Sequence, residues 1–490
     1  MTLSSPDETA PCCPIRPDRY PDVPPAGAPG CPVSVPLPLY GPEFEADPLA
    51  YYATLRQHGP VVPVKVDEDG SIWGWMVLDP DLARDVLQNR DGVWSNDPSV
   101  WRHRGAAQGN HPLLRLLDPR GHMQCHDGAE HSRRRRPVVE AFTELEQHSL
   151  QTRQFITALA DKLIAGFAHQ GKADIEQDYA HRLPLLVMMG LLGIDSQYAD
   201  QVEASVHELI RVGPHADDAS RRMDTVHRKV VTEKAKAPGP DLISRMLQAT
   251  GGKRGDIDEV ESQSWFMMNT AFTTSAWISN TLLEILNDDE LRGQIRDARV
   301  SVGDIANRGL WQSPPLQNVF NRWAQRDTEL GGRHIKQGDM IVLALAASGS
   351  RTRPEDPFSA VGHHAYLAWG AGAHACPAQD LACHIVYIGL ERLFLHLPDM
   401  ALAVPFSEVQ WAPPLVVRGP ASLPVTFTPV HDLDRGEPTW PQQPLYFSQR
   451  PPTPTATKGR GSATTERSSA WSSLVAFMRG QSPRTPPPGR

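Results

Sequence analysis

One short loop, WGAGAHACPAQD at residues 369–380, limits what this chain can fold into more than any other stretch. Gly370 and Gly372 allow positive φ values that other residues avoid, so the backbone can curl closely around a bulky, flat group. Cys376 is one of six cysteines in the chain and lies two positions after His374, just before a helix-like stretch. Because a helix N-terminus stabilises a thiolate, Cys376 is a candidate ligand or nucleophile.

Two other roles for Cys376 are open at this point. A buried, unreactive thiol is the commonest role of a lone cysteine, but it does not explain the two glycines and the histidine that precede it. A hydrolase with a cysteine nucleophile would need a general base and a shaped cleft. No second motif marks either of them.

The overall composition argues against several classes of protein. The 490 residues carry 48 basic and 57 acidic side chains, a formal charge of −9, whereas a general nucleic-acid binder has a basic excess. The chain has no run of about 18 apolar residues and no basic segment before an apolar one, so we expect neither a transmembrane helix nor a signal peptide. The cysteines lack zinc-type spacing, and we expect a cytoplasmic protein whose thiols stay reduced.

Proline content divides the chain into three parts. Residues 1–40 are dense in proline and predict an extended, disordered N-terminal arm. Residues 436–490 form a Pro/Ser-rich tail that we also expect to be disordered. Between them, residues 41–435 show no repeat and no break in composition, which favours a single domain.

Apolar periodicity within this domain predicts mainly helices. Residues 153–167 predict an amphipathic helix whose apolar face holds Phe155, Ile156, Leu159, Leu163 and Phe167. Residues 264–286 are apolar nearly all round, which predicts a long buried helix. Residues 328–348 predict a strand, a turn at 336–339 and a second strand. The expected fold class is mainly α with a small β component.

The cysteine loop resembles the Phe-Gly-x-Gly-x-His-x-Cys haem-binding loop of the cytochrome P450 superfamily, with Trp369 in the aromatic position. The resemblance implies the P450 fold, haem b (iron protoporphyrin IX) as cofactor, and Cys376 as the axial ligand and thus the metal-binding residue. It also implies that Gly370 and Gly372 contact the cofactor. In that family a thiolate ligand pushes electron density onto the iron and favours O–O cleavage.

Three further segments resemble the same family in the expected order. EHSRRRRPVVEAF (130–142) is similar to the His-x-x-x-Arg segment, NRWAQRDTELGG (321–332) to the Arg-containing stretch before the haem loop, and WAPPLVVRGPASLPVTF (411–427) to the closing β segment. The resemblance implies that haem propionates are held by His131, Arg135, Arg322 and His374, because charge-assisted hydrogen bonds to carboxylates are strong.

Three other arginines lie within the first of these segments. Arg133, Arg134 and Arg136 surround Arg135, and we expect them to form a solvated cluster. A nucleic-acid patch is a weaker interpretation, because Glu130 and Glu140 flank the cluster and the net charge is negative.

The chain departs from the family at its most widespread motif, Glu-x-x-Arg. The matching positions hold Arg308 and Trp311 in NRGLWQSPP. Losing one partner of a buried ion pair costs several kcal/mol, but replacing both can be nearly neutral. Loss of the fold therefore does not follow, because Trp311 can fill the site by packing and Arg308 can bond another acceptor. An actinobacterial subgroup of the family also lacks the pair and ends the motif in Trp, and this chain resembles it.

A second departure concerns proton delivery. The family motif Ala-Gly-x-Asp/Glu-Thr corresponds here to residues 269–273, in which Phe272 replaces the acid and Thr273 is retained. The resemblance makes Thr273 the expected catalytic residue, with protons arriving through water and either Asn269 or Thr270. Hydroxyls that cap carbonyls within the helix are the structural alternative. By placement alone, the substrate pocket is expected to include Phe272, Leu316, Val319 and Phe320.

The leading hypothesis is a haem-thiolate monooxygenase that inserts one atom of O₂ into an apolar small organic substrate. No flavin- or nicotinamide-binding region fits in the chain, so a ferredoxin and a ferredoxin reductase are the implied electron donors. The alternative is a haem-binding protein of the same fold that acts as a sensor or interaction partner rather than as an oxygenase. The missing acid and the missing ion pair motivate that alternative.

Overall fold

The computed structural model describes residues 36–68, 70–105, 113–117, 120–210, 215–251, 254–347 and 367–433. These residues are mainly helical with a smaller β component, which confirms the expected fold class. Within the predicted N-terminal arm only residues 36–40 are described, and Leu37–Pro38 among them forms strand β1. The rest of the arm and the whole predicted tail, 436–490, lie outside the described residues.

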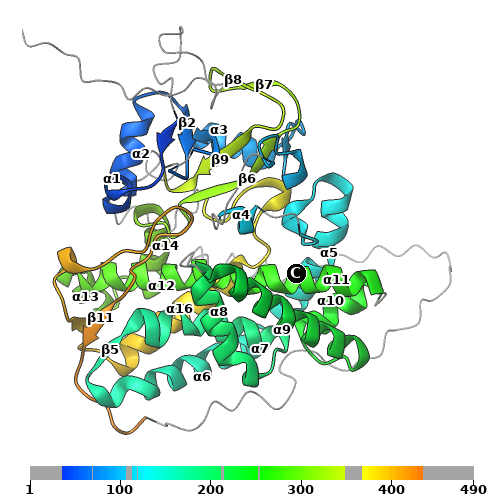
Figure 1. The fold of residues 1–490 in the computed structure, drawn as a ribbon. Helices are drawn as coiled ribbons and strands as arrows, with labels where there is room; N and C mark the ends of the chain where they lie inside the picture. Colours follow the sequence, from blue (N-terminus) through cyan, green and yellow to red (C-terminus); the bar gives the residue numbers. More distant parts are fainter. Residues whose placement is uncertain are drawn as a thin grey trace, which may run out of the picture. The chain divides into compact units, whose positions relative to one another are not determined.

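The largest sheet has the strand order β1-β2-β3-β9-β6-β4 and lies in the upper part of Figure 1. Its strands are β1 (Leu37–Pro38), β2 (Val61–Lys65), β3 (Trp73–Val77), β9 (Met340–Ala344), β6 (Asn318–Ala324) and β4 (Trp94–Ser95). Alternate residues enter different apolar clusters, because successive side chains of a strand point to opposite faces. Val62 and Met76 belong to one cluster, and Val61 and Val77 to the other. The sheet is therefore buried on both faces.

Two smaller sheets complete the β component. They are formed by β10 (Ala401–Leu402), β11 (Pro424–Thr426) and β5 (Lys172–Asp174), and by β7 (Thr328–Leu330) and β8 (Arg333–Ile335). The prediction for 328–348 was incomplete, since it had one turn where the structure has two. Gly331 and Gly332, both with positive φ, separate β7 from β8, and the predicted turn at 336–339 separates β8 from β9.

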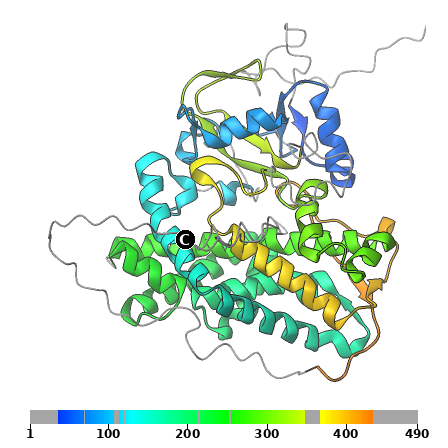
Figure 2. The same ribbon diagram turned by 180° about the vertical axis from the view of Figure 1, so that it is seen from behind.

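Most helices pack together as a second layer, below the sheet in Figure 1. The α-helices of the described residues, those beside the sheet included, are α1 (Pro42–Ala46), α2 (Pro48–Arg56), α3 (Pro80–Gln88), α4 (Leu113–Leu116), α5 (Gly128–Gln147), α6 (Ser149–Phe167), α7 (Arg182–Leu192), α8 (Ala199–Ile210), α9 (Ala216–Lys236), α10 (Leu242–Thr250), α11 (Arg254–Asn269), α12 (Ala271–Leu286), α13 (Asp289–Arg296), α14 (Val302–Gln312) and α16 (Gln379–His396). Figure 2 shows α16, in yellow, lying beside α6 in the helical layer. None of the described helices is long and apolar enough to cross a membrane.

The two predicted helices are confirmed with differences in detail. The helix predicted at 153–167 is α6, but Leu163 is only half-buried and the neighbouring Ile164 is fully buried in its place. The helix predicted at 264–286 is divided into α11 and α12 at Thr270. There the N–H of Thr273 bonds the carbonyl of Thr270, three residues back, whereas α-helical bonds span four. The regular ladder is therefore interrupted beside the predicted catalytic threonine.

Candidate cofactor and substrate site

A cavity of about 370 Å³ lies between the helical layer and the large sheet. The sheet side contributes Val319 and Arg322 of β6, and the helical side contributes α5, α11, α12 and α16. The loop before α16 forms another wall. Apolar side chains predominate around the cavity, so it suits a largely apolar molecule.

Glycine geometry fixes the shape of the loop that carries Cys376. Gly370 and Gly372 have φ values of +69° and +70°. A Cβ on Gly372 would lie 2.8 Å from the Cα of Gln88 in α3, so no other residue fits there without displacement. The N–H of Cys376 donates to the carbonyl of Trp369 at 2.9 Å, and Cys376 lines the cavity. The sequence-based expectation of a tightly curled loop is confirmed.

The thiol of Cys376 lies in a mixed electrostatic environment. Burial raises its pKa, while a backbone hydrogen bond with Ala378 and the nearby charge of Arg135 act in the opposite direction. A metal ion coordinated by the sulfur of Cys376 would stabilise the thiolate far more strongly than these groups do. The site therefore suits a thiolate that is formed by coordination.

Two guanidinium groups line the cavity, one of them buried and the other half-buried. Arg322 is 3% exposed and donates to the carbonyl and side-chain oxygens of the adjacent Asn321, at 2.8 and 3.1 Å. Burial lowers its pKa to about 10. Arg135 donates to the carbonyl of Ala375 at 2.6 Å. Among the described residues neither guanidinium has a carboxylate ion-pair partner, and unpaired buried charges are costly. An anionic cofactor would supply the missing partners.

Two predicted histidines lie beside these arginines. The rings of His131 and His374 have centroids 3.8 Å apart, and His374 Nδ1 lies 2.8 Å from Oε1 of Gln124. Burial, followed by the charge of Arg322, lowers the pKa of His374 to about 2, and burial also lowers the pKa of His131. The ring of His374 is therefore neutral near pH 7, and the pKa shift of His131 acts in the same direction. A neutral imidazole still donates a hydrogen bond through one ring nitrogen, and the role of His131 and His374 at the haem propionates stays a prediction.

The structure brings together most of the predicted site residues, but not all of them. The predicted residues that line the cavity are Arg135, Thr273, Arg322, Gly370, His374 and Cys376. His131 reaches the cavity only through His374, and Gly372 packs against α3. Sequence reasoning missed Gln124 and also Asn96, whose Nδ2 lies 3.5 Å from His374 Nδ1. Neither residue belongs to a motif, so no sequence signal could have found them.

The break between α11 and α12 presents hydroxyl groups to the cavity. Thr270 Oγ1 donates to the carbonyl of Met267 at 2.8 Å, and Asn269 Nδ2 to that of Trp265 at 2.8 Å. These two side chains follow the carbonyl-capping alternative. Thr273 lines the cavity and makes no side-chain hydrogen bond within the described part of the chain. Its hydroxyl is thus available to a ligand or a water molecule.

The residues predicted to line a substrate pocket have a mixed outcome. Phe272, Leu316 and Val319 line the cavity, as predicted. Phe320 does not, because it follows Val319 in β6 and therefore points to the other face of the sheet, into a different apolar cluster. No Asp or Glu is found among the described residues that line the cavity.

The positions of the absent Glu-x-x-Arg pair are filled as expected. Trp311 is 2% exposed and packs in the helical core. Arg308 of α14 forms a short ion pair with Glu284 of α12, with side-chain exposures of 5% and 19%. An ion pair between α14 and α12 therefore takes the place of the family's Glu-x-x-Arg pair, whose two residues lie on one helix.

The expectation of a solvated arginine cluster was only partly correct. Arg136 is well exposed and has only a long contact to Glu140 at 3.8 Å. Arg134, with an exposed side-chain fraction of 18%, pairs with Glu130 and Glu259, and Arg133 contacts the same two carboxylates. Glu259 on α11 was the missed partner, since it is distant in sequence.

Comparison with known proteins gives a consistent result, although no protein-family model matches the chain. The 2-hydroxy-5-methyl-1-naphthoate 7-hydroxylase of Streptomyces carzinostaticus is 28% identical over 395 residues, which cover 78% of this chain and 95% of that enzyme. The cytochrome P450 monooxygenase PikC of Streptomyces venezuelae is 27% identical, with 81% and 95% covered. The structure of CYP154A1 from Streptomyces coelicolor A3(2) superimposes with a TM-score of 0.69 at 26% identity, with 78% and 98% covered.

These findings fit a bacterial member of the cytochrome P450 superfamily. Its fold is the P450 fold, and as an enzyme it is a P450 monooxygenase. A haem cofactor follows from this family membership, and the residues of the cavity fit one. The half-buried Arg135 and the buried Arg322 supply positive charges that have no carboxylate partners in the part of the chain that the structure describes, and Cys376 supplies a thiol that lines the same cavity.

Proposed function

We propose that this P450 binds haem b, with Cys376 as the axial thiolate, and inserts one atom of O₂ into an apolar small organic molecule. The observation that carries the proposal is a pair of guanidinium groups, those of the buried Arg322 and the half-buried Arg135, which line one cavity together with Cys376 and have no carboxylate partner among the described residues. Two propionate groups would neutralise them.

The residues divide the work within this proposal. Arg135 and Arg322 would bind the propionates as cations, and His374, supported by His131, would donate a neutral hydrogen bond. Haem held by a thiolate supplies the activation of O₂ when it is bound. Thr273 would hold a proton-donating water at its free hydroxyl, because Phe272 stands where the family usually has an acid.

The electron donors and the substrate belong to the proposal as well. We expect a ferredoxin and a ferredoxin reductase, because P450s generally receive electrons from redox partners. The apolar lining of the cavity supports an apolar substrate. Arg308 and Trp311 in place of the Glu-x-x-Arg pair support placing the chain in the actinobacterial subgroup that lacks this pair.

The absorption spectrum tests the proposal directly. Purified protein reduced with dithionite and exposed to carbon monoxide should show the Soret band of a thiolate-ligated P450. Cys376→Ala should abolish that band, because the proposed ligand is removed, whereas Cys383→Ala on α16 should retain it. A band at the position of a neutral thiol or a histidine ligand would contradict the assignment.

One observation favours a second candidate function. The cavity has no Asp or Glu among its described lining residues, so proton delivery to oxygen has no acidic side chain to rely on. A haem protein of this fold could then act as a sensor or interaction partner. Formation of a hydroxylated product coupled to NAD(P)H consumption, with surrogate redox partners, would exclude this alternative.

A further inference from the structure

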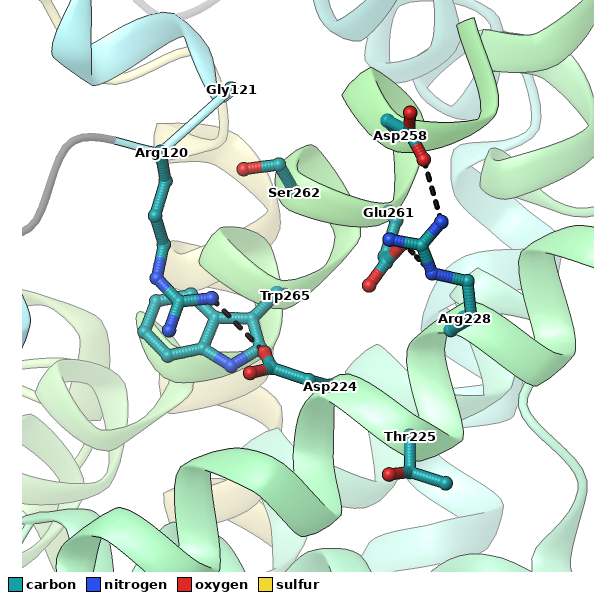
Figure 3. A pocket seen from close by; sticks show the side chains of 9 residues that line it. All are labelled: Arg120, Gly121, Asp224, Thr225, Arg228, Asp258, Glu261, Ser262 and Trp265. Carbon is teal, nitrogen blue, oxygen red and sulfur yellow. Dashed lines mark hydrogen bonds and ion pairs between the residues drawn. The ribbon is translucent and has the colours of Figure 1, made fainter. Parts of the chain in front are cut away.

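A second cavity, of about 450 Å³, adjoins the first between α9 and α11. We call it the vestibule. Figure 3 shows the residues that line it: Arg120, Gly121, Asp224, Thr225, Arg228, Asp258, Glu261, Ser262 and Trp265. Trp265 lines the apolar cavity as well and is 5% exposed. The indole of Trp265 therefore forms part of the wall between the vestibule and the apolar cavity.

Arg120 covers this wall from the vestibule side. Its guanidinium carbon lies 3.9 Å from the ring centroid of Trp265, a close cation–π contact. The same group donates to Oδ1 of Asp224 at 3.0 Å and to Oγ of Ser220 at 3.2 Å, both on α9. Figure 3 shows the guanidinium over the indole and its bond to Asp224. Arg120 thus connects α9 to Trp265 of α11.

The closed arrangement leaves several polar atoms unsatisfied. Nε of Arg120, Nε1 of Trp265 and Oγ of Ser262 are buried without a hydrogen-bond partner among the described residues. Each such group costs about 1–3 kcal/mol. Water could reach these atoms if the Arg120 side chain swung away, so an open arrangement recovers part of the lost free energy. The backbone nearby is fixed, because the N–H of Met123 donates to Gln263 of α11.

The vestibule carries an excess of negative charge. Among the described residues that line it, three carboxylates face two guanidinium groups, and Arg228 contacts both Asp258 and Glu261 at 2.6 Å. Burial raises the pKa of Glu261, with Asp224 and Asp258 adding to the effect and Arg228 opposing it. A cation entering the vestibule would relieve the repulsion among these carboxylates, whereas an anion would increase it.

We propose that Arg120 and Trp265 form a gate between the vestibule and the apolar cavity, and that the vestibule admits amine-bearing cations in preference to anions. The inference rests on the proposed function, because it names the class of substrate that reaches the same cavity. An apolar molecule with a protonated amine would pass the carboxylates, displace Arg120 from the indole and place its apolar part in the cavity.

Binding of three imidazole derivatives to the haem protein tests the gate without any turnover. Histamine is cationic, 4-ethylimidazole is neutral and imidazole-4-acetate is anionic, and the same ring ligates iron in each. Stopped-flow absorbance of the Soret band gives the association rates. Wild-type protein should bind histamine faster than imidazole-4-acetate, and the preference should fall at high ionic strength.

Two variants separate the gate from the charge. Arg120→Ala should raise the association rate of all three probes by about tenfold, because the cation–π contact and the bonds to α9 are lost. Arg228→Ala removes the same charge without touching Trp265, so the neutral probe should keep its wild-type rate while the preference for histamine rises about two- to threefold. Glu261→Gln should lower that preference.

Several outcomes would overturn the inference. An unchanged rate of 4-ethylimidazole in Arg120→Ala would remove the gate, and an unchanged preference in both Arg228→Ala and Glu261→Gln would remove the charge selection. Arg120→Lys, which keeps the charge but not the planar stack, replaces Arg120→Ala if that variant does not fold. If the protein holds no haem, the proposed function fails. The rates at which cationic, neutral and anionic methanethiosulfonates modify Cys376 are then compared in the same variants. Mass spectrometry identifies the modified residue.

Discussion

At the scale of single residues, Arg322 is a buried charge that is costly to the fold and that the proposed function assigns to a ligand. Its guanidinium is 3% exposed and bonds only to the neighbouring Asn321 among the described residues. A buried charge without an opposite charge destabilises the fold. In the proposed function the same group would stabilise a bound carboxylate, so the residue would serve binding at the expense of the apo-protein.

Replacing this residue should therefore have opposite effects on stability and on cofactor binding. We expect Arg322→Met to leave the apo-protein as stable as wild type or more stable, because an unpaired buried charge is removed. The same variant should bind haem at least about tenfold more weakly, since a charge-assisted hydrogen bond contributes about 1.5–3 kcal/mol. Urea unfolding of the apo-protein and haem titration measure the two effects. Destabilised apo-protein with unchanged haem affinity would show a purely structural role.

At the scale of elements, α12 and α14 are joined by an ion pair that the family motif does not predict. Arg308 of α14 contacts Glu284 of α12, and Nε1 of the buried Trp277 on α12 donates to the carbonyl of Ala306 on α14 at 2.7 Å. α14 itself begins with a capping box in which Ser301 and Asp304 bond each other's backbone N–H groups. The helix is thus fixed both at its start and along its side.

Breaking this ion pair should cost more than removing it. Arg308→Met leaves Glu284 largely buried without this cation and should lower the free energy of unfolding by about 3 kcal/mol. The double variant Arg308→Met with Glu284→Leu should recover most of that loss, because both charges are then absent. Urea denaturation of the four proteins in the cycle gives the coupling energy. Additive effects of the two substitutions would mean that the pair does not couple the helices.

At the scale of the whole molecule, buried neutral histidines connect stability to pH. Burial lowers the pKa values of His122 and His227 to about 3, and His227 Nδ1 lies 2.9 Å from Oγ of Ser264. Between pH 3 and the ordinary histidine pKa of 6.5 the unfolded chain binds a proton at each position and the folded chain does not. Stability therefore falls as the pH decreases through this range.

The pH dependence of unfolding should reveal this effect. Each such histidine contributes a loss of about 1.4 kcal/mol per pH unit below pH 6.5. His227→Gln keeps a group that can bond Ser264 but does not titrate. Between pH 6 and pH 5 its free energy of unfolding should therefore fall by about 1.4 kcal/mol less than that of the wild type. Denaturation at several pH values compares the two proteins. Equal slopes would mean that His227 is protonated in the folded state as well.

Tertiary structure also placed groups that the sequence left separate. The vestibule combines Arg120, which precedes α5, with Asp224 on α9 and Glu261 on α11. No motif links these positions, and in the sequence alone each of them looks like an ordinary surface charge. Their proximity depends on how α9 crosses α11, which is decided by packing of apolar faces and not by local sequence.

The sequence by itself determined the helical class, the curled loop around Cys376 and the family resemblance, because these depend on local periodicity, on glycine conformation and on short motifs. It also indicated that Trp311 would pack and that Arg308 would find an acceptor. Only the tertiary structure decided that the acceptor is Glu284, that burial lowers the pKa values of His131 and His374 and that Phe320 faces away from the cavity. Burial, pairing and strand register arise from contacts between distant segments, and local sequence does not encode them.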